Sequence, residues 1–130
     1  MSELVAFLRA RLDEDEQAAR KLLDEKRPGR AERWEFCDDG AIRDTGPRRS
    51  LRVKFTWPPE ADHIVRHDPA RVLADVEAKR ELLRLHTLNG WVCSTCDNGE
   101  VPGDGYPCPT LRLLALPYAS HADYDEAWRP

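Results

Sequence analysis

Three cysteines in the C-terminal third of the sequence have the spacing of metal ligands. Cys93 and Cys96 form a C-x2-C pair that is followed by Asp97-Asn98-Gly99, and Cys108 comes after eleven further residues. Asparagine and glycine permit the tight turn that directs two thiolates at one ion. The pattern predicts a zinc knuckle, a short loop that holds a zinc ion. We also expect Cys108 to start a helix, whose N-terminal partial charge would favour its thiolate.

Tetrahedral zinc needs a fourth ligand, and the sequence offers three. His86 is the first choice, because it ends a predicted helix on the stripe that faces the core. His121 is the alternative, and Cys37 lies far upstream beside a predicted turn. A site of three cysteines and one histidine has no open coordination position, so it would be structural and not catalytic.

Two other interpretations of these cysteines remain open. The thiols could be buried and reduced around a core histidine. A C-x-x-C pair can also perform redox chemistry, although no β-α-β pattern surrounds this one. Because no signal-peptide pattern opens the sequence, we expect a cytoplasmic protein, in which thiols stay reduced.

Two further groups of residues carry possible chemistry. His63 and His67 lie four residues apart on one predicted helix face, each beside an aspartate, which suggests a second metal site or a general base held by a carboxylate. A cap at a helix junction is the simpler interpretation, because Asp68-Pro69 should end the helix at the second histidine. Asp68 should then be the N-cap of the next helix, with Pro69 at its first position. Five basic residues around a predicted hairpin would suit phosphate groups or protect an edge strand: Arg43, Arg48, Arg49, Arg52 and Lys54.

The elements that must position these residues follow from the hydrophobic pattern. We predict a helix-dominated α+β fold in a single domain over residues 1–130, with a small antiparallel hairpin or sheet and a zinc knuckle. Its parts are an N-terminal helix (1–27), the sheet (33–57), two helices (60–86), the knuckle (86–108) and a C-terminal helical segment (109–128).

The N-terminal helix has a long apolar stripe formed by Leu4, Phe7, Leu8, Leu12, Ala19, Leu22 and Leu23. In one alternative this stripe packs on the central helix and on a sheet face made by Leu51, Val53, Phe55 and Trp57. In the other, part of the stripe stays uncovered and binds a protein partner or a second copy of the chain.

Composition limits the possible functions. The chain of 130 residues is 34% charged and 41% hydrophobic, with a net charge of -4, and no stretch approaches the length of a membrane span. Only residues 27–57 are basic overall, with eight basic against five acidic residues. Nucleic-acid binders usually carry a stronger basic patch, so nucleic acid is a secondary hypothesis.

Four stretches together resemble a known family. They are LVAFLRARLDEDE, ADHIVRHDPARVLADVEAKRELLRLH, CSTC and PCPTLRLLALPYASHADYDEAW. The sequence resembles a family of small actinobacterial proteins, from hosts and phages, that is classed as a domain of unknown function. Positions that match its pattern are His63, His67, Asp68, Pro69, His86, Cys93, Cys96 and Cys108. Tyr106 stands where the pattern has tryptophan, and the spacing from Cys96 to Cys108 is longer.

The resemblance implies no activity, cofactor or catalytic residue. The leading hypothesis is therefore a non-enzymatic, zinc-stabilised interaction or regulatory module. The alternatives are a weak nucleic-acid binder that uses the basic hairpin and a metal-dependent hydrolase that uses His63 and His67.

Overall fold

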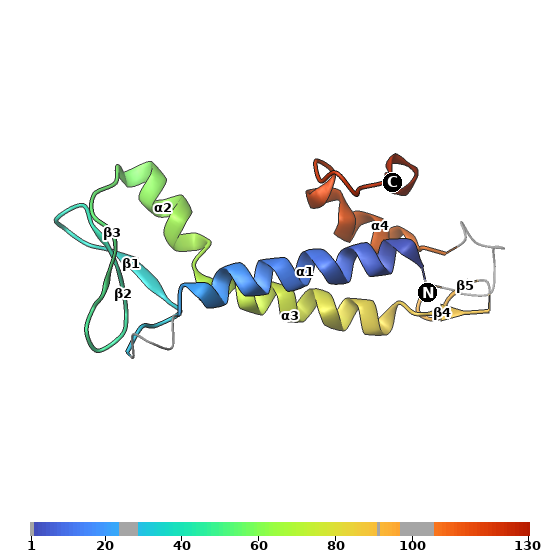
Figure 1. The fold of residues 1–130 in the computed structure, drawn as a ribbon, viewed down its shortest axis with the longest axis horizontal. Coiled ribbons are helices and arrows are strands. Elements are labelled where there is room, and N and C mark those ends of the chain that lie inside the picture. The colour runs from blue at the N-terminus through green and yellow to red at the C-terminus, as the bar shows by residue number, and fades with distance from the viewer. Residues whose placement is uncertain (1, 24–28, 91, 97–105) are drawn as a thin grey trace. The chain divides into compact units, whose positions relative to one another are not determined.

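The structure is a computed structural model, and it describes residues 2–23, 29–90, 92–96 and 106–130. Its elements, shown in Figure 1, are α1 (Glu3–Lys21), β1 (Trp34–Phe36), β2 (Ile42–Asp44), β3 (Leu51–Val53), α2 (Pro58–Arg66), α3 (Pro69–Leu85), β4 (Leu88–Asn89), β5 (Val92–Cys93), α4 (Pro109–Ala115) and two short 3-10 helices, η1 (Leu116–Tyr118) and η2 (Glu126–Trp128). The predicted helix-dominated α+β fold with small antiparallel sheets is confirmed.

The residues form two compact units, and the boundaries between them fall within α1 and α3. Unit 1 comprises Met1–Glu14 and Glu77–Pro130, and unit 2 comprises Asp15–Val76. Each unit has buried apolar side chains of its own. The prediction of a single domain stays a prediction.

In unit 1 the first turns of α1 run antiparallel to the last turns of α3, and α4 lies beside them (Figure 1). An ion pair of 2.8 Å between Arg80 Nη2 and Asp13 Oδ1 joins the two long helices. Five leucines are buried between the helices of this unit, namely Leu4, Leu8, Leu12, Leu83 and Leu111. The predicted apolar stripe of α1 is therefore covered within the protein over these turns, and the hypothesis that it forms an interface is wrong there.

Unit 2 is built on a three-stranded antiparallel sheet in the order β1-β2-β3. The central strand β2 supplies the fully buried Ile42, with Ala41 just before it. A left-handed turn at Gly40 (φ +83°) joins β1 to β2, and a Cβ atom there would stand 2.7 Å from the Phe55 ring. Only glycine suits this turn, because it must accept both the positive φ and the close ring.

The expected apolar face of the third strand is exposed. The exposed fractions are 53% for Leu51, 58% for Phe55 and 68% for Trp57. The strand ends at Val53, so the alternation of apolar residues beyond it does not reflect a buried sheet face. The prediction that α1 packs on this face is therefore wrong. The alternation of apolar and polar residues indicates a strand, but it does not tell which face of the sheet another element covers.

The helix boundaries follow local capping chemistry. Asp68 caps α3 as predicted, since its Oδ1 accepts from the Arg71 backbone N–H at 3.0 Å. Its Oδ2 accepts from the Trp34 backbone N–H at 3.1 Å, which links α3 to β1. Pro58 begins α2, where its missing N–H costs no helical hydrogen bond. At the C-terminus the Asp125 side chain caps η2 by accepting from the Ala127 backbone N–H at 2.9 Å.

A buried ion pair stabilises the edge of the sheet. Asp44 is fully buried and lies 3.3 Å from Arg52 Nη2, whose side chain is 5% exposed. Asp44 Oδ1 also accepts hydrogen bonds from the backbone N–H groups of Gly46 and Ser50, at 3.0 and 3.2 Å. Burial lowers the pKa of the Arg52 guanidinium, Arg30 lowers it further, and Asp44 opposes both effects. Asp44 thus neutralises a cation and closes a turn at the same time.

No described helix of this chain is both long enough and apolar enough to cross a membrane.

The Asp44–Arg52 pair provides the first prediction. Asp44→Asn should lower the free energy of unfolding by about 3 kcal/mol, because it leaves a buried guanidinium without a counter-charge. The matched control is Asp62→Asn, which removes the exposed pair with Arg66 at 3.0 Å and should cost less than about 1 kcal/mol. Urea unfolding followed by circular dichroism measures both. Equal effects of the two substitutions would show that the Asp44 pair is not buried.

Candidate metal centre

Four side chains with metal-binding atoms converge in unit 1. His86 Nδ1 lies 3.3 Å from Cys93 Sγ, 3.4 Å from Cys96 Sγ and 3.6 Å from Cys108 Sγ. The ligand atoms of all four residues lie within 4.8 Å of one another. They are the four residues that the sequence placed first as ligands, and the structure brings them together.

The spacing of these atoms matches that around a single ion. Bonds of about 2.3 Å to sulfur and about 2.0 Å to nitrogen, at tetrahedral angles, separate the sulfur and nitrogen atoms by about 3.5 Å. The three observed sulfur–nitrogen distances, 3.3, 3.4 and 3.6 Å, bracket this value. Three soft sulfur donors and one imidazole form a set that binds zinc in structural sites. The cluster is therefore compatible with a tetrahedral metal site.

The end of α3 and the knuckle hold each other in place. His86 follows directly after the last residue of α3, and its backbone N–H donates to Leu82 at 3.0 Å. The Leu85 carbonyl, which has no partner within the helix, accepts from the Ser94 hydroxyl at 3.1 Å and from the Thr95 hydroxyl. The two residues between Cys93 and Cys96 thus cap the helix that presents His86.

A hairpin of two short strands brings the chain back toward His86. The strands β4 and β5 pair Leu88 with Cys93, and Gly90 turns the chain with a φ of 64°. The sequence predicted only the loop of the knuckle over 86–108, and not this ladder. Two-residue strands are too short for an alternating pattern, so periodicity could not reveal them.

Tyr106 supports the histidine from the other side. Its hydroxyl donates to the His86 backbone carbonyl at 3.0 Å. The sequence interpretation had noted Tyr106 only as a departure from the tryptophan of the family pattern. A tyrosine close to Cys108 in sequence is the only signal that it offered, and it did not indicate this contact.

The thiols differ in their tendency to ionise. Burial raises the pKa of the Cys108 thiol to about 11, and the sulfur atoms of Cys93 and Cys96 add to the rise. For Cys93, burial also acts upward, but the backbone N–H groups of Cys96 and Thr95 and the two other thiols outweigh it, and its pKa is lowered. Without a cation, the Cys93 thiol therefore loses its proton more easily than an ordinary thiol does, and the Cys108 thiol less easily.

Cys108 directly precedes a helix, α4, with proline at the first position, as expected. A backbone N–H of the first turn of this helix, that of Leu111, lowers the pKa of the Cys108 thiol, as predicted. Burial and the neighbouring sulfur atoms outweigh this effect, so the pKa is raised overall.

The two alternative fourth ligands lie elsewhere. His121 Nδ1 is 3.0 Å from Arg11 Nη1 and accepts from the Asp123 backbone N–H at 3.0 Å. Cys37 belongs to unit 2, where Arg49 Nη2 approaches its sulfur at 3.6 Å. Neither residue belongs to the group that contains His86.

His63 and His67 form a pair without a third ligand. Their ring centroids are 4.4 Å apart, and His67 Nδ1 lies 2.8 Å from the His63 carbonyl oxygen. As predicted, α2 ends just before His67. The neighbouring aspartates do not orient the rings, because Asp62 pairs with Arg66 and Asp68 caps α3. Within the described ranges, the His86 group is the only one of three or more potential metal ligands.

Comparison with known proteins identifies the family. No curated protein and no solved structure matches the chain. A family model described as a family of unknown function, DUF6221, matches residues 1–130. Because this match spans the whole sequence, the chain belongs to DUF6221, a family of unknown function.

Proposed function

We propose that His86, Cys93, Cys96 and Cys108 bind one structural zinc ion, and that the protein is a zinc-stabilised interaction module without catalytic activity. The observation that carries the proposal is the approach of three sulfur atoms to within 3.6 Å of one imidazole nitrogen. A divalent cation at their centre would offset the unfavourable accumulation of thiolate charge that burial opposes.

The donor set supports zinc, and the ligand count supports a structural role. Sulfur and imidazole donors in a tetrahedral arrangement select zinc over the harder magnesium and calcium ions. Four protein ligands leave no position for water or substrate, whereas catalytic zinc keeps one open. When bound, zinc would supply a cross-link between the end of α3, the β4–β5 hairpin and the start of α4. We also propose a cytoplasmic location, where the ligands stay reduced.

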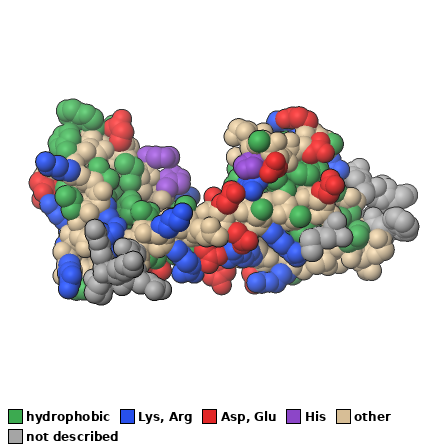
Figure 2. Space-filling view, viewed as in Figure 1, with side chains coloured by type: hydrophobic (Ala, Val, Ile, Leu, Met, Phe, Trp, Pro, Cys, Tyr) green, Lys and Arg blue, Asp and Glu red, His purple; other side chains and the backbone are tan. Residues whose placement is uncertain are grey.

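The interaction role rests on unit 2. Four large apolar residues stand exposed on and beside its sheet: Phe36, Leu51, Phe55 and Trp57. The rings of Phe55 and Trp57 pack edge to face at 5.3 Å, and we call this pair the aromatic surface. Figure 2 shows hydrophobic side chains on the part of the molecule that carries β1–β3 and α2. Exposed apolar side chains that pack on one another are typical of protein-binding surfaces.

The basic hairpin gives little support to the hypothesis of nucleic-acid binding. Three of its five cations already have carboxylate partners, in the pairs Arg43–Asp39, Arg49–Glu35 and Arg52–Asp44. Paired cations have less charge to offer phosphates. A hydrolase at His63 and His67 gains no support, because the pair lacks a third ligand among the described residues. An actinobacterial and phage origin stays a prediction of the resemblance.

The second prediction is one zinc ion per chain in protein purified without chelator. Cys93→Ser should abolish stoichiometric zinc, because removal of one of four ligands opens a structural site. A chelator should lower the melting temperature of the wild-type protein, since metal binding and folding are coupled. Elemental mass spectrometry and thermal unfolding measure the two effects.

Cys37→Ser is the matched control, because Cys37 lies outside the cluster. This variant should keep its zinc and its response to chelator. A metal content near zero in reduced, folded wild-type protein would refute the site. Equal zinc loss in both variants would refute the assignment of ligands.

The third prediction concerns the aromatic surface. Trp57→Ser removes a side chain that is 68% exposed, so it should change the free energy of unfolding by less than about 1 kcal/mol. Ile42→Ala, in the buried centre of the sheet, should cost about 2–5 kcal/mol. The Trp57 variant should also bind less of a hydrophobic dye and show weaker self-association in sedimentation. If Trp57→Ser destabilised the protein as much as Ile42→Ala, the residue would belong to the core and the interaction role would lose its basis.

A further inference from the structure

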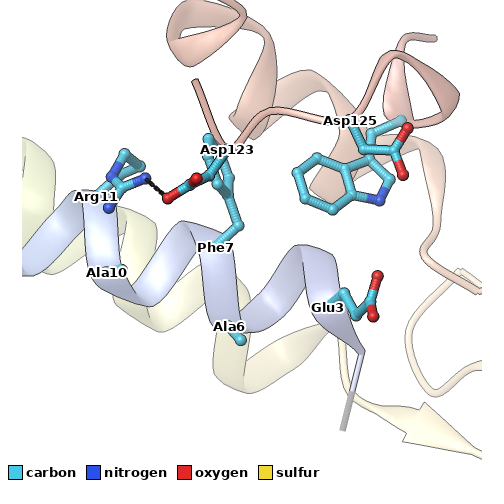
Figure 3. A pocket seen from close by; sticks show the side chains of 8 residues that line it. Glu3, Ala6, Phe7, Ala10, Arg11, Asp123 and Asp125 are labelled. Carbon is cyan, nitrogen blue, oxygen red and sulfur yellow. Dashed lines mark ion pairs between the residues drawn. The ribbon is translucent and has the colours of Figure 1, made fainter. Parts of the chain in front are cut away.

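A cavity of about 400 Å³ lies in unit 1 between α1 and the C-terminal segment. Its wall includes Phe7 of α1 and Trp128 of η2, and carboxylates stand around it. Figure 3 shows the carboxylates of Glu3 and Asp125 at one end, and the pair of Arg11 and Asp123 at the other. The volume lies within the range of pockets that bind small molecules, roughly 300–1,000 Å³.

The aromatic wall is rigid because the rings contact one another. Phe7 lies at the centre of a cluster with Tyr118, His121, Tyr124 and Trp128, at centroid distances of 5.1 to 6.4 Å. Trp128 also contacts Tyr124 edge to face at 5.6 Å. The indole is thereby held in one orientation before any ligand arrives, which reduces the entropy lost on binding.

Three rings of this cluster already have a cation from the chain over them. Arg11 lies 5.0 Å from the centroid of Phe7, Lys79 5.8 Å from that of Tyr118, and Arg129 5.8 Å from that of Tyr124. Among the described residues, no lysine or arginine takes this position over Trp128. Tryptophan binds cations best of the aromatic side chains, and here its indole faces the cavity together with Glu3 and Asp125.

Arg11 does not make the cavity basic. Its side chain is 9% exposed and forms two bonds of 3.0 Å to the Glu14 carboxylate. Its remaining donors face His121 Nδ1 at 3.0 Å and Asp123 Oδ2 at 3.9 Å. Glu14 and Asp123 neutralise this guanidinium. The carboxylates of Glu3 and Asp125 therefore make the opposite end of the cavity negative.

We propose that this cavity binds an organic cation, an alkylammonium or guanidinium group, against the indole of Trp128 between Glu3 and Asp125. The ring face attracts the cation and the apolar carbons around it, while the carboxylates supply the counter-charge. A bare metal ion suits the cavity poorly, because no group of three ligands forms there among the described residues. The cation could belong to a free amine or to a lysine or arginine side chain of a peptide. The cavity uses none of the four cluster residues, so this inference is independent of the zinc proposal.

The test uses the metal-loaded, full-length protein labelled with ¹⁵N. The probe is choline, and the readout is the indole N–H resonance of Trp128, which is assigned by its loss in Trp128→Phe. The uncharged analogue 3,3-dimethylbutan-1-ol has the same shape and should bind at least about tenfold more weakly, because it lacks the cation–π and ionic attraction. A second arm tests acetyl-Gly-Lys-Gly-amide and acetyl-Gly-Arg-Gly-amide. If either peptide binds more tightly than choline, a protein side chain is the source of the cation.

Four variants test the geometry. Glu3→Gln and Asp125→Asn should each weaken choline binding about three- to tenfold, since each removes one counter-charge. Ala6→Leu keeps the charge but fills space in the cavity, to which Ala6 contributes, so it should weaken binding as well. Glu126→Gln is the matched control, because Glu126 pairs with Arg129 and does not line the cavity. Its binding should stay within a factor of two of the wild type.

Three results would overturn the proposal. The first is the absence of any shift of the Trp128 resonance with all of the cationic probes, in wild-type protein that is folded and contains metal. The second is equal binding of choline and its uncharged analogue. The third is equal loss of binding in Glu126→Gln and Glu3→Gln. Each would show that the cavity does not recognise a positive charge.

Discussion

Three sulfur atoms meet one imidazole nitrogen at 3.3 to 3.6 Å in unit 1, with His86, Cys93 and Cys108 buried and Cys96 exposed, and this convergence constrains the residues around it. Burial and the neighbouring sulfur atoms raise the pKa of the Cys108 thiol, so three thiolates this close together are unfavourable without a cation. The proposed divalent ion would offset this unfavourable charge. The hydroxyls of Ser94 and Thr95 and the phenol of Tyr106 then serve to hold His86 and the knuckle at ligand distance.

The candidate metal ligands were predictable from the sequence because the geometry that unites them is mostly local. A C-x2-C pair fixes two sulfur atoms within one turn, Asn89-Gly90 returns the chain, and His86 ends the helix just before that turn. The cap at Asp68 and the end of α2 before His67 were predictable for the same reason, since they depend on residues one to four positions apart. His121 was an equally acceptable ligand by type, and only the fold separates it from the cluster.

Features that depend on distant contacts were not predictable. The alternating residues after Leu51 indicate a strand, but the sequence does not say which side another element covers, and this side is exposed. From the sequence alone, Asp44 and Arg52 would be taken for two surface charges. They become buried only when β2 and β3 pair in the folded sheet. The contacts of Phe7 join the start of α1 to residues more than a hundred positions later. No periodicity or motif links such residues.

The distribution of charge between the units favours different partners for the two surfaces. Unit 1 contains seven basic and eleven acidic residues, so it carries the whole net charge of -4, while unit 2 contains thirteen of each. The negative net charge of unit 1 would favour the proposed organic cation over polyanions. The aromatic surface of unit 2 lies on a neutral unit, where apolar contact and not long-range attraction decides binding. Salt should therefore weaken binding at the cavity and leave contacts of the aromatic surface largely unchanged, because screening acts on charges and not on apolar area.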